Sequence, residues 1–501
     1  MGIVIRQSIK GTLVTYIGAF IGFLTTLFIV PKFLGEELFG LTRVLLEAGL
    51  LFAIIFQLGT SQSAIRFFPH FKSKDKKNNG FFFYLISIVT IGFLLFIPVF
   101  FLLKQPVMDY FSTKSPLFVD YLYWVIPLTL FLLYWLTFEV YSNVLMRIAI
   151  PKFIREIVLR VLVIAVYVAY GLGYIDLNTF VGSFVCVYGI AMLATIFYVS
   201  RIGSISLKHD SSFITKPLKK DFLSYTPILL LGSLGGTLVS KIDVFMVAGM
   251  EGLDFTGIYA VAFFMVSIVD IPARSITAIS APIGAEALKR GDLREANLLY
   301  KKVSLHQLLV GSVFFLLIWI NIDNIYEIIP NGERFSAGKW VVLFIGLAKL
   351  IEVTLNFGGI LVGFSKYYHW TLYFVFFISG ITIWFNYLLI PKFGISGAAL
   401  STVLSVLISY VLQQILILIK IKANPYSWGT LKVIGVIALA FLLNYFLPEL
   451  SNPYFDGIYR TIIVGSASVL MIYYFKVSGE VNQLTETICG GVFGKLLKKK
   501  K

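Results

Sequence analysis

Charged side chains lie at helical spacing inside two apolar stretches of this 501-residue sequence. Asp270 and Arg274 are one helical turn apart, so they share a face and can form an ion pair. Pro272 lies between them and cannot donate a hydrogen bond to the preceding turn, so we expect a kink that serves as a hinge. In the second stretch, Lys349 and Glu352 share another face. A structural ion pair is the alternative interpretation for each cluster.

Two further groups of charges follow the same pattern. Arg43 and Glu47 are one turn apart, and an interfacial ion pair is their simplest interpretation. Lys241 and Asp243 are two residues apart and point to different sides of a helix. Lys241 either lines a cavity or extends along the helix to reach water.

Charges of both signs at mid-membrane depth are typical of a carrier, because each buried charge needs a partner or a wet cavity. The cations can receive an anionic headgroup. The carboxylates can bind a proton or a sodium ion as the coupling ion. The candidate headgroup ligands are Arg43, Lys241, Arg274 and Lys349, and the candidate coupling residues are Asp243, Asp270, Glu352 and Glu47.

The elements that carry these residues are predicted to cross a membrane. The chain is 58% hydrophobic and only 14% charged, a composition that a soluble domain does not have. Apolar runs of about 20 residues recur along it, each long enough to cross the hydrocarbon layer. We predict an all-α polytopic membrane protein with about fourteen transmembrane helices. The expected spans are residues 11–30, 42–67, 81–103, 121–145, 153–172, 178–200, 222–248, 256–284, 303–322, 339–363, 368–390, 394–420, 430–448 and 458–476.

One turn between spans is repeated at a constant offset of 217 residues. The first copy is Gly18, Val30, Gly35, Glu37 and Gly40, and the second is Gly235, Val247, Gly252, Asp254 and Gly257. Six expected spans separate the copies, so the repeat is parallel. It predicts two parallel six-helix bundles, residues 1–205 and 206–424, followed by accessory helices 13 and 14 in residues 425–476. Residues 477–501 form a basic tail.

The loops alternate in charge. Lys and Arg gather after the even-numbered spans, and the other loops are acidic or poor in charge, which places both termini in the cytoplasm. This pattern accounts for the net charge of +16 without nucleic acid as a partner. The lysines either contact anionic membrane lipids or only set the orientation.

Motifs of soluble catalysis are absent from the sequence. It contains no Gly-Lys-Ser/Thr loop, no His-Glu-x-x-His and no Cys-x-x-Cys. We therefore expect a protein that is not an enzyme, with no metal and no cofactor other than a coupling ion.

Three segments resemble the bacterial polysaccharide and O-antigen flippases, the polysaccharide transporter branch of the multidrug/oligosaccharidyl-lipid/polysaccharide exporter superfamily. They are residues 30–40, residues 243–246 with 257–260, and residues 390–399. The resemblance implies two six-helix bundles in a V around a basic cavity, in which Arg43, Lys241 and Arg274 face a diphosphate.

The same resemblance implies a function and a location. The expected substrate is an undecaprenyl-diphosphate-linked oligosaccharide, moved across the bacterial inner membrane by alternating access for surface polysaccharide or lipopolysaccharide biosynthesis. We expect a monomer in contact with membrane lipids and with polysaccharide polymerase machinery.

Four alternatives stay open at this stage. A multidrug exporter of the same fold would use Asp243 and Glu352 in an acidic pocket. A major-facilitator carrier also has parallel halves, but residues 71–79 lack its basic signature. A membrane glycan polymerase or ligase would need a larger outer loop, and a scaffold would not need charges within spans. The expected first span has no arginine in its apolar core, which disfavours lipid II as the substrate.

Overall fold

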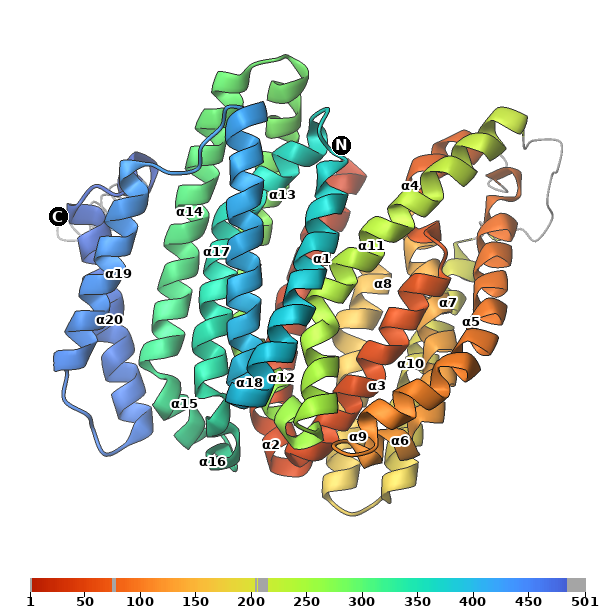
Figure 1. Ribbon diagram of the computed structural model, residues 1–501, viewed down its shortest axis with the longest axis horizontal. Helices are drawn as coiled ribbons and strands as arrows, with labels where there is room; N and C mark the ends of the chain where they lie inside the picture. Colours follow the sequence, from red (N-terminus) through yellow and green to blue (C-terminus); the bar gives the residue numbers. More distant parts are fainter. Residues whose placement is uncertain (1, 74–77, 203–204, 206–214, 484–501) are drawn as a thin grey trace, which may run out of the picture. The chain divides into compact units, whose positions relative to one another are not determined.

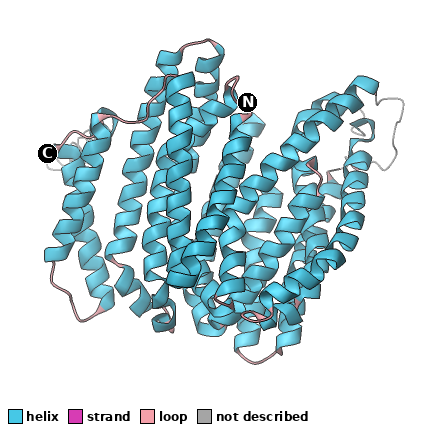
Figure 2. Cartoon of the chain, viewed as in Figure 1, coloured by secondary structure: helices cyan, strands magenta, loops and turns pink. Residues whose placement is uncertain are grey.

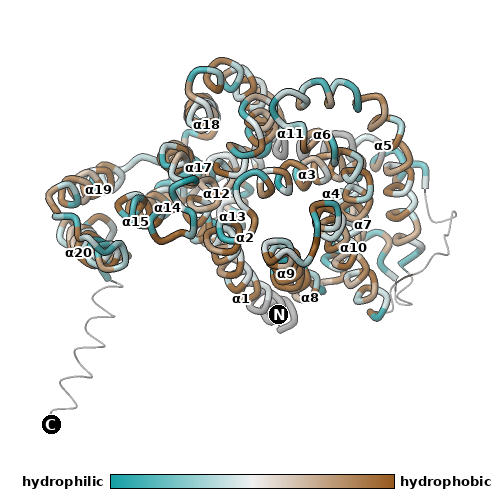
Figure 3. Tube along the Cα trace, turned by 90° about the horizontal axis from the view of Figure 1, so that it is seen from below, coloured by the Kyte–Doolittle hydropathy of each residue, from teal (hydrophilic) through white to brown (hydrophobic). Residues whose placement is uncertain are grey.

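The computed structural model describes residues 2–73, 78–202, 205 and 215–483. Every regular element in these residues is a helix (Figure 2). Hydrophobic residues run along the long helices (Figure 3). The predicted all-α multi-pass membrane fold is therefore confirmed. The predicted basic tail beyond residue 483, and residues 206–214 of the segment that joins the two repeats, lie outside the described residues.

Most of the described helices follow one another with short connections (Figure 1). The first half of the chain contains α1 (Gly2–Leu24), η1 (Thr25–Ile29), α2 (Val30–Phe33), α3 (Gly35–Phe56), α4 (Thr60–Phe71), η2 (Asn78–Gly80), α5 (Phe81–Phe111), α6 (Pro116–Asp120), η3 (Leu122–Trp124), α7 (Val125–Val144), α8 (Ala149–Phe153), η4 (Ile154–Val158), α9 (Leu159–Gly171) and α10 (Leu177–Arg201). The second half contains α11 (Lys216–Met250), α12 (Leu253–Ser267), α13 (Asp270–Lys289), α14 (Leu293–Ile320), α15 (Ile322–Ile328), α16 (Gly332–Phe335), η6 (Ser336–Gly338), α17 (Lys339–Phe364), α18 (Trp370–Lys420), α19 (Trp428–Phe446) and α20 (Pro453–Tyr474).

Polar side chains begin several of these helices. Asp176, Asp292 and Asn452 each accept a hydrogen bond from a backbone N–H in the first turn of α10, α14 and α20. The hydrogen bond that Asp176 accepts from Thr179 lowers the pKa of the Asp176 carboxyl. Such caps satisfy donors that the helix itself leaves without partners, and they explain why the helices start where they do.

The exact number of fourteen spans is not confirmed. In the described residues, 10 helices are long and apolar enough to cross a membrane, or 11 if the bent pair α12 and α13 is one span. The other three expected spans correspond to α9, α11 and the second half of α18. α9 is separated from α8 by the charged π-helix η4, and α18 contains two expected spans joined at Gly394, where φ is 56°.

The chain forms two compact units. The first contains residues 1–261 and 382–398, and the second contains residues 262–381 and 399–501. The predicted boundaries at residues 205 and 424 stay predictions.

The first unit is packed around α7, which contacts α3, α4, α5 and α10. Its core near α4 and α5 is aromatic, with Phe67, Phe68, Phe81, Phe82 and Tyr141 all buried. Aromatic side chains bury a large area each, so this cluster fixes the packing of four helices.

The second unit is packed around α14, which contacts α13, α17, α19 and α20. The expected accessory helices, α19 and α20, belong to this unit. A buried ion pair between Arg460 and Asp456 (2.6 Å) forms in the first turns of α20. Asn324 of α15 donates to the same carboxylate at 2.6 Å. These polar contacts attach α20 to α15, because a buried carboxylate is stable only when it is paired.

The repeated turn has the same geometry in both copies. Gly35 and Gly252 have positive φ values of 78° and 112° and end the helices α2 and α11. A Cβ atom at Gly40 would overlap the backbone carbonyl of Leu253, and one at Gly257 would overlap the backbone carbonyl of Glu36. Leu253 and Glu36 are also 217 residues apart, so the two contacts are reciprocal, as a local two-fold axis requires. The structure therefore supports the internal repeat at this crossing.

Candidate functional site

The first unit contains an ion pair between two long helices. Lys241 of α11 donates to Glu47 Oε1 of α3 at 2.7 Å. The Glu47 side chain is buried, whereas the Lys241 side chain is one-third exposed. The ion pair therefore connects a buried carboxylate to a partly accessible ammonium. The second carboxylate oxygen, Glu47 Oε2, is buried without a hydrogen-bond partner. Both residues are candidates from the sequence, but their partnership is not visible in it.

Arg43 lies one turn before Glu47 and does not take part in this pair. Its guanidinium lies over the ring of Phe39, with 4.7 Å between the guanidinium carbon and the ring centroid. Its Nε atom is buried and has no hydrogen-bond partner. In the described residues no carboxylate forms an ion pair with Arg43. An arginine in this state can accept a bidentate anion without first breaking an ion pair.

Asp243 forms a second cluster in the first unit, and we call it the Asp243 cluster. The carboxylate is buried on α11, where it accepts hydrogen bonds from Tyr259 Oη of α12 (3.0 Å) and Asn386 Nδ2 of α18 (2.8 Å). The amide oxygen of Asn386 is buried without a partner. Rotation of that amide would place two oxygens, one from each residue, beside each other. Oxygens from a carboxylate, an amide and a phenol can hold a proton or a small hard cation.

The second unit contains a cluster of one lysine and two carboxylates, the Lys349 cluster. Lys349 Nζ on α17 lies 3.1 Å from Asp270 Oδ2 on α13 and 2.8 Å from Glu352 Oε2. The side chains of Lys349 and Asp270 are both mostly buried. One ammonium between two carboxylates leaves a formal charge of −1. The Lys349 cluster therefore favours the binding of a proton or a cation over the binding of an anion.

The expected ion pair between Asp270 and Arg274 does not form. Asp270 pairs with Lys349, and Arg274 is exposed. Asp270 begins α13 at a bend of 48° between α12 and α13, and its carboxylate is taken by Lys349 of α17 instead. The expected kink is present at this point. Pro272 has no N–H to donate, and the carbonyl of Ile268 accepts a hydrogen bond from Ile271 N instead. The hinge function of Pro272 stays a prediction.

A further charged network was not anticipated from the sequence. Arg155 lies between Glu139 (2.9 Å) and Glu156 (3.3 Å), and Arg160 pairs with Glu156 at 3.0 Å. From the sequence alone, Arg155 is one of the basic residues that follow the fourth expected span, and Glu139 is a single polar residue within that span that suggests only a local hydrogen bond. The spacing of Glu156 and Arg160 across one turn of an apolar stretch was the available signal. The network connects Arg155 and Glu156 of the π-helix η4 to Glu139 of α7 and Arg160 of α9.

No group of three His, Cys, Asp or Glu side chains in the described part of the chain could hold a metal ion. The clusters above are instead ion pairs and hydrogen-bonded carboxylates within membrane-spanning helices. They fit the handling of charged substrates and ions.

Comparison with known proteins gives the family. A family model described as polysaccharide biosynthesis protein matches residues 4–283, which is more than half of the chain. The chain belongs to this family. The match includes α3, α11 and α12, and so includes Arg43 and the Lys241–Glu47 pair. No curated protein matches the sequence at a significant level.

Solved structures share the fold at low sequence identity. The lipid II flippase MurJ in its inward closed conformation superposes with a TM-score of 0.75 at 13% identity, covering 93% of this chain and 99% of its own. An inward-facing multidrug resistance MATE family transporter of the MOP superfamily gives a TM-score of 0.59 at 14% identity, covering 81% and 94%. A MOP superfamily transporter from Pyrococcus furiosus gives 0.53 at 12% identity, covering 84% and 96%. The protein therefore has the fold of these transporters.

Proposed function

We propose that this protein is a flippase that moves an undecaprenyl-diphosphate-linked oligosaccharide across the bacterial inner membrane by alternating access. The family and the transporter fold support a role in the transport of a lipid-linked precursor of a polysaccharide. In this proposal both termini are cytoplasmic, the protein acts as a monomer, and its product is delivered to polysaccharide polymerase machinery. It catalyses no covalent reaction.

The observation that carries the proposal is the state of Arg43. Glu47, the acid one turn away, is occupied by Lys241, so the guanidinium of Arg43 has no carboxylate partner in the described residues. A diphosphate would satisfy the buried N–H of Arg43 by a charge-assisted hydrogen bond. It would also approach Lys241, whose ammonium is one-third exposed. In this role Glu47 holds Lys241 in position rather than binding the coupling ion.

The second unit would supply a cation of its own. Arg274 is exposed on α13, and we propose that it contacts the anionic headgroup during transport. Lys349 is proposed as a ligand only after protonation of Asp270 or Glu352, because both carboxylates occupy it in the structure.

Coupling is assigned in this proposal to the buried carboxylates. Asp243, with Tyr259 and Asn386, would hold a proton or a sodium ion in the first unit. Asp270 and Glu352 would do so in the second unit, where their excess negative charge attracts a cation. Occupation of either site changes a network of buried charges, and such a change can bias a conformational equilibrium. No other cofactor is required.

Deletion of the gene in its native host tests the function. The lipid fraction and the surface glycan would then be analysed separately. Loss of surface polysaccharide, together with accumulation of polyprenyl-linked repeat units inside the cell, is the expected result. Normal surface polysaccharide would contradict the proposal.

A multidrug exporter is the second candidate, because the structure also shares its fold with a multidrug resistance transporter. The excess carboxylate of the Lys349 cluster would suit a cationic drug. Increased sensitivity of the deletion strain to cationic dyes, with unchanged surface glycan, would favour this candidate.

A further inference from the structure

The first unit contains a large apolar cavity whose lining includes none of the residues of the charged clusters. Its volume is about 410 Å³, within the range of pockets that bind small molecules. The cavity is lined by residues of α3, α5, α11 and the first half of α18, together with residues of α6 and η3. Most of its lining is aliphatic or aromatic, including Phe100, Phe111 and Phe118.

The cavity arises from the shape of α5. Pro98 and Pro106 lie inside this helix, and each removes one backbone hydrogen bond and favours a bend. Figure 1 shows α5 curving along its lower half toward α6. Ser115 donates to the carbonyl of Ala248 at 2.6 Å and so holds the start of α6 against α11. The space beside α5 is therefore bordered by elements that are held in place.

Among the described residues that line this cavity, Lys104 alone is charged. Lys104 lies on α5, and its ammonium donates to the hydroxyl of Tyr123 and lies 4.8 Å from the centre of the same ring. In the residues that the structure describes, no carboxylate forms an ion pair with Lys104. A lysine ammonium has three donors, so a half-buried lysine with one phenol partner has donors available for an anion.

We propose that this cavity binds an anionic phospholipid, with one acyl chain in the apolar space and the phosphate on Lys104. An apolar cavity of this size in a membrane protein is open to lipid chains, and a cation at its wall selects an anionic headgroup. Neither Arg43 nor any residue of the Asp243 cluster lines the site, and the site does not depend on the proposed function. With the cytoplasmic termini expected from the sequence, it would take lipid from the outer leaflet.

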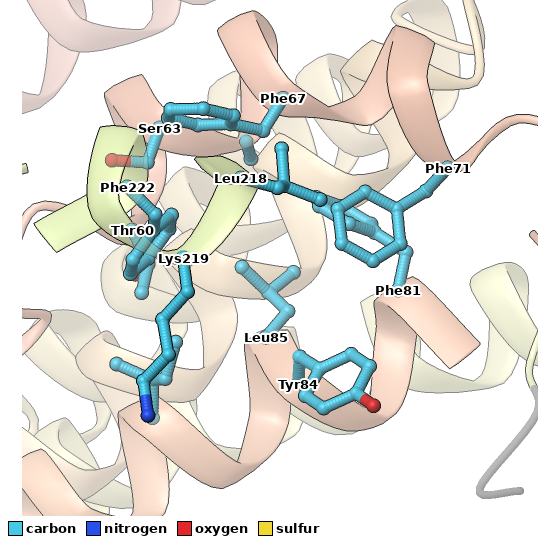
Figure 4. A pocket seen from close by; sticks show the side chains of 12 residues that line it. Thr60, Ser63, Phe67, Phe71, Phe81, Tyr84, Leu85, Leu218, Lys219 and Phe222 are labelled. Atoms are coloured by element: carbon cyan, nitrogen blue, oxygen red, sulfur yellow. The ribbon is translucent and has the colours of Figure 1, made fainter. Parts of the chain in front are cut away.

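A smaller cavity provides an internal comparison. It has a volume of about 120 Å³ and lies among α4, α5 and α11, with Phe67, Phe71 and Phe81 in its wall. Figure 4 shows the Lys219 side chain extending away from the ring of Phe71. This cavity also has one lysine in its lining but less than a third of the volume. Lys219→Ala is therefore a matched control for Lys104→Ala.

The test uses the purified full-length protein in phosphatidylcholine vesicles that contain a trace of photoactivatable lipid. The diazirine is in the acyl chain, and the headgroup is either phosphatidylglycerol or phosphatidylcholine. We expect phosphatidylglycerol to label peptides of α5 and α11 more strongly. Lys104→Ala should lower this labelling about fivefold, the effect of one lysine near an anionic lipid surface. Lys219→Ala should leave it unchanged.

A second variant removes the space rather than the charge. Ala48→Phe places a ring in the cavity and should abolish labelling by both lipids, provided that the thermal unfolding midpoint shows a folded protein. Equal labelling by the two headgroups, or wild-type labelling of Lys104→Ala, would overturn the proposal. Displacement by polyprenyl phosphate but not by unlabelled phosphatidylglycerol would also overturn it and would assign the cavity to a polyprenyl chain.

Discussion

Arg43 differs from Lys241 and Lys349 in what surrounds its charged group. Lys241 and Lys349 are paired with carboxylates, whereas the guanidinium of Arg43 rests on the ring of Phe39. We predict that Arg43→Ala lowers export at least about tenfold, because loss of a charge-assisted hydrogen bond costs about 1.5–3 kcal/mol. Export is measured by the surface polysaccharide of a deletion strain that carries the variant.

The control for this prediction is another arginine beside an aromatic ring. Arg66 lies 5.7 Å from the ring centroid of Phe67 but is exposed on α4. Arg66→Ala should export normally. Equal export by Arg43→Ala and the wild type, at equal protein levels in the membrane, would remove Arg43 from the proposed headgroup site.

Asp243 is the buried carboxylate best placed for ion coupling in the first unit. Asp243→Asn keeps the shape of the side chain but removes the charge that a proton or cation would neutralise. We predict that transport by this variant no longer responds to an imposed pH or sodium gradient. Uptake is measured in vesicles with and without each gradient. Asp109→Asn is the control, because it changes an exposed carboxylate that accepts a hydrogen bond from Gln105. This variant should retain the response of transport to the gradient.

Sequence patterns pointed to candidate residues but found only those partners that lie on the same helix. Spacing of three or four residues detects pairs within one helix, and it correctly paired Lys349 with Glu352. It also suggested Arg43 with Glu47 and Asp270 with Arg274. The structure pairs Glu47 with Lys241 and Asp270 with Lys349, which lie on other helices. Tertiary partners of this kind have no fixed sequence spacing.

At the level of elements, the crossing of α3 and α12 depends on two glycines. Gly40→Ala or Gly257→Ala would push a Cβ atom into a neighbouring backbone carbonyl, which cannot move as a side chain can. We predict a loss of about 2–3 kcal/mol in stability for each. Thermal unfolding in detergent measures the change.

Gly380→Ala is the matched control for these glycine variants, because nothing lies within 4 Å of its added Cβ. It should be neutral or stabilising by about 0.5–1 kcal/mol. If Gly40→Ala and Gly257→Ala behaved like Gly380→Ala, the close reciprocal crossing would be incorrect.

The bend between α12 and α13 offers a test of the hinge. Pro272→Ala restores a backbone N–H one turn after Ile268 and should straighten the helix pair. We predict that transport falls about tenfold while stability is maintained or increased, because flexible hinges often limit stability. Pro282→Ala, also inside α13, should affect transport little. Equal transport by the wild type and Pro272→Ala would mean that the bend is only structural.

For the whole molecule, composition predicted the fold class, and the repeat located a turn that recurs in the chain. Apolar length identifies a membrane helix reliably, since it reflects the thickness of the bilayer. Apolar length does not predict how many continuous helices form where a helix is interrupted. The π-helix η4 interrupts the fifth expected span, and Gly394 interrupts α18. Sequence spacing does not reveal the ion pair of Glu139 and Arg155, because the two residues lie on different helices.

The central claim is that the protein itself moves a lipid-linked oligosaccharide across a bilayer. The most direct measurement reconstitutes the purified protein in vesicles that carry an undecaprenyl-diphosphate-linked oligosaccharide. A membrane-impermeant glycosidase then reports the fraction of glycan on the outer leaflet over time. We expect protein-dependent movement that is accelerated by an ion gradient and strongly slowed by Arg43→Ala. Equal rates with and without protein would contradict it.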